Sequence, residues 1–188
     1  MADWMVETPR LLLRRWRESD REPFRRMNAD PRVMEFFPAC LTRPESDGLI
    51  DRIQVHLDRH GFSLYAAELR ETGDFIGFVG MIWTPFEAHF TPCVEVGWRL
   101  DYPFWNRGLA TEGARECLRY AFDTLELPEV VAMTAPSNVR SRRVMEKLGM
   151  TWNPADNFEH PGCPVGHKLR EHVLYRTRSF HCPVQAAV

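Results

Sequence analysis

The sequence predicts a mixed α/β domain in which antiparallel strands precede a β-α-β-α unit. Two observations support this fold class. In the middle of the chain, two runs rich in aromatic and aliphatic residues flank the turn signal Glu-Thr-Gly-Asp at 71–74, which is typical of a β-hairpin. Further on, two segments with helical spacing each follow a short apolar run. We expect one domain over residues 1–188, with a core at about 8–177 and a tail at 178–188.

The first third of the chain predicts one strand followed by helices. Residues suited to helix starts and ends delimit the helices, among them Asp20 as an N-cap and Gly61 as a C-terminal stop. Pro44 suits a first helical turn, where its missing N–H costs nothing. The expected elements are a strand at 11–15, a helix from Ser19-Asp20 to Met27, a short helix after Asp30-Pro31, and a helix from Pro44 to Gly61.

The rest of the chain predicts a meander and then alternating helices and strands. One face of the first helix is apolar, since Ala114, Leu118 and Ala121 recur at three- and four-residue spacing. Residues 153–166 are rich in Pro, Gly and His and are expected to be irregular. The expected elements are strands at 62–69, 75–83 and 93–100, a helix at 110–125, a strand at 130–134, a helix at 138–148 and a last strand at 172–176.

Composition narrows the possible partners. The formal net charge is -2, from 24 Lys and Arg against 26 Asp and Glu, which argues against a nucleic-acid binder. No apolar run approaches the roughly 20 residues of a bilayer span, and the N-terminus has no secretory signal. The five cysteines are scattered and form no C-x-x-C pair. We therefore expect a cytoplasmic monomer or homodimer with no membrane partner and no nucleic-acid partner.

The segment W-N-R-G-L-A-T-E-G at 105–113 follows a predicted strand and opens a predicted helix. Gly108 and Ala110 are small where a backbone must come close to a ligand. The first N–H groups of a helix have no intrahelical partner, and the helix dipole makes that end positive. The segment is therefore a candidate phosphate site, although a plain strand-to-helix turn could also need Gly108 for its φ angle.

About thirty residues later, the predicted helix at 138–148 carries both polar and basic residues. Its spacing places one set of residues on a common face: Asn138, Ser141, Met145 and Leu148. Its basic residues are Arg140, Arg142, Arg143 and Lys147. Most of these charges are expected on a solvated face, and one or two of them, with Arg107, are candidates to meet the phosphates of a nucleotide-like ligand.

In this order and spacing, the motifs resemble those of the GNAT acyltransferase superfamily, and within it those of the RimJ/RimL-type N-acetyltransferases. The resemblance covers about residues 8–177 and lies in T-P-R-L-L-L-R at 8–14, N-A-D-P-R-V-M at 28–34, V-E-V-G-W-R-L at 94–100, W-N-R-G-L-A-T-E-G at 105–113, S-N-V-R-S-R-R-V-M-E-K-L-G-M at 137–150 and H-V-L-Y-R at 172–176. It implies a central, mostly antiparallel twisted sheet of six to seven strands flanked by helices. It also implies acetyl-coenzyme A as the donor and an amine as the acceptor.

The resemblance also implies which residues bind acetyl-coenzyme A. The backbone amides expected to hold the pyrophosphate are those of Arg107, Gly108, Leu109, Ala110 and Thr111. The strand residues expected to pair with the pantetheine arm are Val96, Trp98 and Leu100, with Asn138, Ser141 and Arg143 completing the set. Trp105 departs from the usual Gln or Arg of the superfamily, but an aromatic residue there is similar to the RimJ/RimL branch.

Acetyl transfer needs a neutral amine, and amines with a pKa of about 8 or above need a base at neutral pH. Glu95 is the candidate base, because it lies among apolar residues on the strand expected to hold pantetheine; a surface glutamate or a salt bridge is the structural alternative. Strand alternation places Glu95 on the opposite face from Val96. His89 and Glu159 are weaker candidates. Ser141 could protonate the leaving thiolate, or only bind the cofactor, or the thiolate could leave without help.

Two further chemistries were weighed and rank lower. Cys117 is expected to be a buried structural thiol, so we favour direct attack on the thioester without an acetyl-enzyme. Five residues near the C-terminus could suggest a zinc site: His160, Cys163, His167, His181 and Cys182. Their spacing matches no compact zinc module, so we expect no metal.

The acceptor amine stays open at this point between a protein α-amine and a small amine such as an antibiotic, a polyamine or an amino acid. Longer acyl donors, and a non-catalytic acyl-coenzyme A sensor, are further alternatives. Residues Glu18 to Arg59 and Asn153 to His172 are expected to set acceptor choice. Aromatic residues that could line its pocket, or equally be core, are Phe36, Phe37, Trp83, Phe86 and Phe90.

Overall fold

A nine-stranded sheet runs through the computed structural model, which describes residues 4–179. The strands follow the order β1-β2-β3-β4-β5-β6-β9-β7, and β8 pairs with β9. The longer strands are β3 (Leu64–Leu69), β4 (Phe75–Trp83), β5 (Val94–Leu100), β6 (Glu129–Thr134) and β9 (Glu171–Arg178). The shorter ones are β1 (Trp4–Glu7), β2 (Leu11–Arg14), β7 (Thr151–Trp152) and β8 (Phe158–Glu159). The helices are α1 (Arg21–Ala29), α2 (Arg43–His60), α3 (Leu109–Asp123) and α4 (Val139–Lys147), with short 3-10 turns η1 (Glu18–Asp20), η2 (Tyr102–Phe104) and η3 (Pro154–Asp156).

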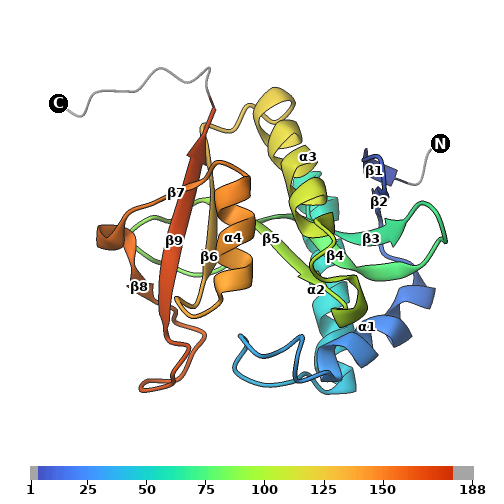
Figure 1. The fold of residues 1–188 in the computed structure, drawn as a ribbon, viewed down its shortest axis with the longest axis horizontal. Coiled ribbons are helices and arrows are strands. Elements are labelled where there is room, and N and C mark those ends of the chain that lie inside the picture. Colours follow the sequence, from blue (N-terminus) through green and yellow to red (C-terminus); the bar gives the residue numbers. More distant parts are fainter. Residues whose placement is uncertain (1–3, 180–188) are drawn as a thin grey trace.

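The sheet is antiparallel except where β5 meets β6. These two strands are parallel, and only one residue pair, Glu95 and Val131, joins them. By contrast, seven pairs join β5 to β4 and six join β6 to β9. Figure 1 shows β5 and β6 diverging below their meeting point. The sheet is therefore split at its middle, which leaves a wedge between two well-paired halves.

Each face of the sheet is covered by its own pair of helices. Strand alternation sends Phe78 of β4 to one face, where it packs with α1 and α2, and Val79 to the other, where it packs with α3. Figure 1 shows α3 and α4 in front of the sheet and α2 behind it. Gly77 of β4 has φ +130°, and a Cβ there would lie 2.2 Å from the Arg99 carbonyl oxygen. Only glycine lets the β4 backbone come so close to β5 at this point.

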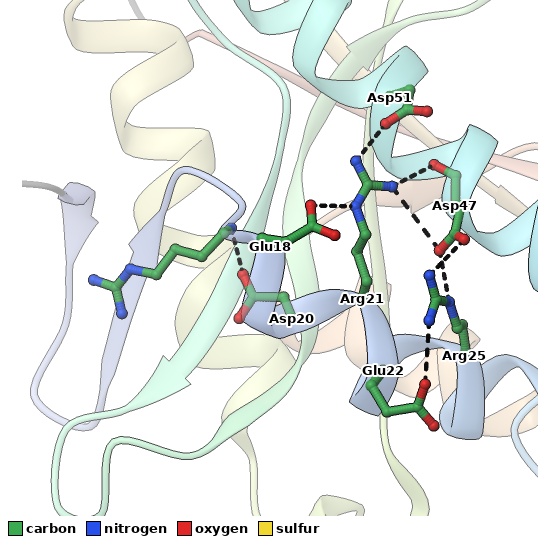
Figure 2. Close-up of polar contacts among 8 residues, drawn as sticks. Glu18, Asp20, Arg21, Glu22, Arg25, Asp47 and Asp51 are labelled. Carbon is green, nitrogen blue, oxygen red and sulfur yellow. Dashed lines mark hydrogen bonds and ion pairs between the residues drawn. The ribbon is translucent and has the colours of Figure 1, made fainter.

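Ion pairs fasten α1 against α2. Figure 2 shows Arg21 and Arg25 of α1 reaching the acidic residues Asp47 and Asp51 of α2. The Arg25–Asp47 pair is bidentate, with both N–O distances below 2.8 Å. Thr42 and Glu45 form a capping box at the start of α2, and Pro44 lies in its first turn as predicted. These contacts hold the chain segment that connects the two helices over one end of the sheet.

The structure confirms the predicted fold class and most of its elements, with two corrections. The predicted short helix after Asp30-Pro31 is wrong: residues 31–36 form successive turns, because Asp30 is extended before Pro31 and its carboxylate accepts the Arg32 amide at 2.9 Å. The sheet also has more than the expected six to seven strands, since β1, β7 and β8 are too short to show a period in sequence. Within residues 4–179, no helix has the length and apolar character needed to cross a membrane.

Candidate active site

A cleft of about 540 Å³ opens where β5 and β6 separate. Its walls come from the turns before α2, strands β3 to β6, the segment from Phe104 to Thr111, α4, and the chain between β8 and the start of β9. The cleft therefore reaches both faces of the sheet at its split. Every residue predicted to bind the cofactor or to catalyse lines it, with the exception of Arg107.

The edge of β5 that faces the cleft lacks a partner strand. Beyond Glu95 no described residue of β6 continues the ladder, so backbone groups of Gly97 to Arg99 on that edge are left without a strand partner. An unpaired sheet edge readily accepts an extended chain as an added strand. Trp105 closes the far end, where its Nε1 donates to the Leu100 carbonyl oxygen at 2.7 Å. The open edge is thus a bounded slot that fits an extended, amide-bearing arm such as pantetheine.

The start of α3 offers further free backbone donors. Gly108 is its N-cap in the left-handed region, with φ +76°, and no side chain caps the first turn. The amides of Leu109, Ala110 and Thr111 therefore have no intrahelical partner and border the cleft. Glu112 holds this turn in place, because its carboxylate accepts from the Arg10 amide and from the Thr8 hydroxyl. The arrangement suits an anion such as pyrophosphate.

Arg10 is a residue of this site that the sequence did not identify. Its guanidinium donates to Glu112 Oε2 and to the Arg107 carbonyl oxygen, and it lies 3.6 Å from where a Gly108 Cβ would be. The motif T-P-R-L-L-L-R contained Arg10, but nothing in the sequence placed that motif beside Gly108. Arg107 itself does not line the cleft, and its guanidinium lies 5.7 Å from the centroid of the Phe104 ring.

The α4 helix presents one free hydroxyl and two free cations to the cleft. Asn138 caps the helix by accepting from the Ser141 amide, and its own amide donates to the Thr134 hydroxyl at 3.0 Å. Among the described residues, none accepts from or donates to the Ser141 hydroxyl, and none forms an ion pair with Arg143 or Lys147. Arg142 lies elsewhere, since it stacks on Trp152 and donates to the Tyr175 hydroxyl. The sequence left open which basic residues face a ligand, and the geometry points to Arg143 and Lys147.

Glu95 lies on the floor of the cleft, at the last residue where β5 and β6 are paired. No described residue forms a hydrogen bond or ion pair with its carboxylate. Burial raises the pKa of Glu95 from 4.5 to about 7. The carboxyl group is therefore close to half ionised at neutral pH, which suits a group that takes up a proton and releases it again.

The opposite half of the cleft is built from aromatic side chains and one arginine. Phe36 and Phe37 from the turns before α2 line it, together with Phe78 of β4. Arg99 of β5 lies between them, with its guanidinium 4.0 Å from the centroid of the Phe37 ring. Burial lowers the pKa of Arg99 to about 10, so it stays charged at neutral pH. The helices α1 and α2, expected to set acceptor choice, contribute no lining residue; the connection between them does.

Two histidines close the cleft at the β8–β9 end; both lie in the segment Asn153 to His172 that was expected to set acceptor choice, although neither was singled out for the acceptor site. The rings of His160 and His172 lie 4.8 Å apart and both line the cleft. Burial, and then the neighbouring His160, lower the pKa of His172 to about 4, so its ring is neutral at pH 7. The irregular sequence at 153–166 has no periodic pattern from which the contact between His160 and His172 could be predicted.

Several other candidates lie outside the cleft. His89 is within 3.7 Å of Asp156, and Glu159 pairs with Arg170. Cys117 is fully buried inside α3, and burial raises the pKa of its thiol to about 12, so the prediction of a structural thiol is confirmed. The aromatic residues predicted as possible pocket walls but absent from the lining are Trp83, Phe86 and Phe90.

The structure gives no grouping that suggests a metal. Within residues 4–179, no three His, Cys, Asp or Glu side chains converge as a metal site would require. His160 Nδ1 accepts from the Gly162 amide, and His167 Nδ1 accepts from the Leu169 amide. His181 and Cys182, the last two of the weighed zinc candidates, lie outside the described residues.

Comparison with known proteins agrees with this architecture. The family model described as "Acetyltransferase (GNAT) domain" matches residues 10–151. The uncharacterized protein YkkB of Bacillus subtilis is 30% identical over 81% of this chain and 88% of its own length. The FsC-acetyl coenzyme A-N(2)-transacetylase of Aspergillus fumigatus is 32% identical over 78% of this chain and 64% of its own.

A solved structure extends the similarity to the fold. The acetyltransferase from Agrobacterium tumefaciens superimposes with a TM-score of 0.77 at 27% identity, covering 95% of this chain and 96% of that one. The family match spans the cofactor half of the cleft, including β5, the start of α3 and α4. The chain therefore belongs to the GNAT acetyltransferase family and is an acetyl-coenzyme A-dependent N-acetyltransferase.

Proposed function

We propose that this enzyme acetylates a primary amine, either a protein N-terminal α-amine or the amine of a small molecule, by direct transfer with Glu95 as the general base. The observation that carries the proposal is the position of Glu95. Its carboxylate lines the cleft where β5 and β6 part, has no described partner, and has a pKa of about 7. A base with that pKa can accept a proton from an ammonium group at neutral pH.

Each half of the cleft has a separate task in this proposal. The β5 edge holds the pantetheine arm, and the amides of Gly108 to Thr111 hold the pyrophosphate, with Arg143 and Lys147 adding charge. Bound acetyl-coenzyme A supplies the acetyl thioester. The acceptor enters from the face that carries Glu95. Val96 points to the opposite face of β5, so the amine approaches the thioester at the β5 edge from the Glu95 side.

Direct transfer is supported by the state of the cysteines. A covalent route needs an accessible thiolate. Cys117 is fully buried with a raised pKa, and Cys163, the one described cysteine that lines the cleft, is 5% exposed. The more exposed thiols of Cys40 and Cys93 do not line the cleft. The Ser141 hydroxyl is free and lines the cleft, so it is placed to give a proton or a hydrogen bond to the thiol sulfur as it leaves.

The test measures coenzyme A release and the acetylated product together. The panel contains peptides that differ in their first residue, aminoglycoside-type amines, polyamines and amino acids. Mass spectrometry should find N-acetylated product for at least one amine and no acetylated protein after incubation with acetyl-coenzyme A alone. Thiol release without any acetylated amine, or a stable acetyl-enzyme, would contradict the proposal.

A further inference from the structure

The Arg99 guanidinium is a buried positive charge for which the described residues supply no counter-ion. Its Nη1 donates to Asn28 Oδ1 at 2.7 Å, and its Nε is buried without any hydrogen-bond partner. No described carboxylate lies within ion-pair distance of it. The contrast with Arg14 is informative, because that buried arginine pairs with both Asp20 and Glu68, whereas the half-buried Arg99 pairs with no described carboxylate. Buried charges are normally paired, so an unpaired one beside a cleft indicates a missing ligand group.

The free part of Arg99 is fixed in position. Asn28 is fully buried and donates in turn to the Ser46 hydroxyl at 2.9 Å, which holds the acceptor of Nη1. The rings of Phe37 and Phe78 lie 4.0 and 5.4 Å from the guanidinium carbon. With Nη1 engaged and Nε buried, the N–H groups of Nη2 are the part of the guanidinium left for a ligand in the cleft. They can donate to an oxygen atom of a carboxylate or a phosphate.

Glu95 and Arg99 lie on the same face of β5, with Gly97 between them. Four residues of extended strand separate their Cα atoms by about 13 Å. Gly97 leaves space between them, since a Cβ there would contact only Leu64 Cδ2 at 3.8 Å. The walls beside this gap are apolar, from Leu64 and Phe78. The face therefore presents a base, an apolar gap and a cation in a row.

We propose that the acceptor is a primary amine that also carries a carboxylate or a phosphate, separated from the amine by several atoms, and that Arg99 binds this anion. The proposal rests on the proposed function, because the amine must sit at Glu95. It excludes polyamines as preferred acceptors, since Arg99 repels a second ammonium group. The acceptor face has one other basic residue nearby, Arg140, and its guanidinium is already paired with Glu35.

Matched acceptors test the proposal directly. The probes are ε-aminocaproate, its neutral amide, aminopentyl phosphate and spermidine, each assayed for acetylated product by mass spectrometry. In the wild-type enzyme, kcat/KM for the two anionic amines should exceed that for the amide by about 30-fold or more, as expected when a buried ion pair is completed. The better of the two anions identifies the source of the charge. In R99M this preference should disappear, while the KM for acetyl-coenzyme A stays within about twofold.

Two variants separate binding from folding. R99K keeps the charge but loses the planar fork, so a reduced preference for the anion should remain. R119M removes an exposed arginine of α3 that pairs only with Glu116, and its preference should equal that of the wild type. Should R99M fail to fold by circular dichroism, R99K provides the comparison.

The two levels of the proposal fail in different ways. Equal turnover of the amide, spermidine and the anionic amines would overturn the role of Arg99 and leave the acetyltransferase proposal standing. A preference for the anions that persists undiminished in R99M would overturn it as well. If acetyl-coenzyme A binds but no amine of any kind is acetylated, the proposed function itself fails. If neutral amines are acetylated and neither anionic probe binds or reacts, the anionic acceptor is excluded.

Discussion

The two halves of the cleft are built from different parts of the polypeptide. The cofactor half uses backbone groups: the open edge of β5 and the free amides at the start of α3. The acceptor half uses side chains: Glu95 and Arg99 on one strand face, with the rings of Phe36 and Phe37 opposite. Backbone groups offer the same hydrogen bonds whatever the residue, whereas a side chain determines the charge, size and polarity of its surroundings.

The two halves differ in how freely substitutions can change substrate specificity. Substitutions in the cofactor half must keep the backbone path, so the constraint there is conformational. Substitutions in the acceptor half leave the backbone intact and alter the chemistry that an amine meets. One fold can therefore keep its donor and change its acceptor. A substitution in one half should therefore leave the function of the other half nearly unchanged.

Glu95→Gln should cause the largest loss, because it removes the base and keeps its shape. We expect kcat to fall by about 10²–10⁴-fold, with acetyl-coenzyme A affinity nearly unchanged. In the wild type, log kcat should rise with pH through about 7, where Glu95 ionises. The variant should lack this inflection and regain part of its rate at higher pH, where the free amine is deprotonated in solution. Near-normal turnover of the variant at pH 7 would show that Glu95 is not the general base.

The same variant should be more stable than the wild type in alkaline solution. The folded-state pKa of about 7 lies above the ordinary 4.5, so the folded protein favours the protonated form. Ionisation of Glu95 therefore costs the folded state nothing below pH 4.5. Above that pH it lowers the free energy of unfolding, and this loss is complete once the pH has risen through 7. Glutamine carries no such penalty. We expect E95Q to gain about 1–3 kcal/mol in the free energy of unfolding at pH 8, measured by denaturant titration, and to gain nothing at pH 4.

Gly108→Val should weaken acetyl-coenzyme A binding by about 10- to 100-fold, the value of one or two charged hydrogen bonds. Valine disfavours the left-handed φ of +76°, so the amides that follow will turn away from the anion. Gly61→Val is a matched control, because Gly61 ends α2 with φ +77° and a Cβ there meets nothing within 4 Å. Calorimetry at a temperature where both variants are folded should find normal binding for Gly61→Val. Equal losses in both would mean that backbone strain alone explains the result.

The sequence predicted the cofactor half far better than the acceptor half, for a physical reason. Helix starts, strand runs and glycine positions follow from local backbone preferences, and they placed Gly108 and Asn138 correctly at the starts of their helices. The acceptor half depends on which distant side chains meet. Arg99 stood in a quoted motif, but its isolation from any acid is a property of the packing around Asn28. His160 and His172 meet only because β8 pairs with β9.

Arg143→Met should raise the KM for acetyl-coenzyme A by about 2- to 5-fold and leave kcat nearly unchanged. Arg143 is exposed at the rim, and exposed ion contacts are worth about 1 kcal/mol or less. The effect should shrink as salt is added, because solvent screens such contacts. Arg142→Met is the control, since Arg142 stacks on Trp152 instead. A change in the KM for the acceptor, with the KM for acetyl-coenzyme A unaltered, would contradict this prediction and assign Arg143 to the acceptor half of the cleft.

Ser141→Ala should have the smallest effect, a fall in kcat of about 3- to 10-fold. The Ser141 hydroxyl is free to donate, and one hydrogen bond contributes about 0.5–1.5 kcal/mol. A thiol with a pKa of about 8.5 leaves readily as a thiolate, so an obligatory proton donor is not required. Ser137→Ala, an exposed serine just before the same helix, should be neutral. If kcat of S141A instead falls by more than about 10²-fold with cofactor affinity intact, Ser141 is the proton donor. Departure of the thiol would then depend on α4 as strongly as activation of the amine depends on β5.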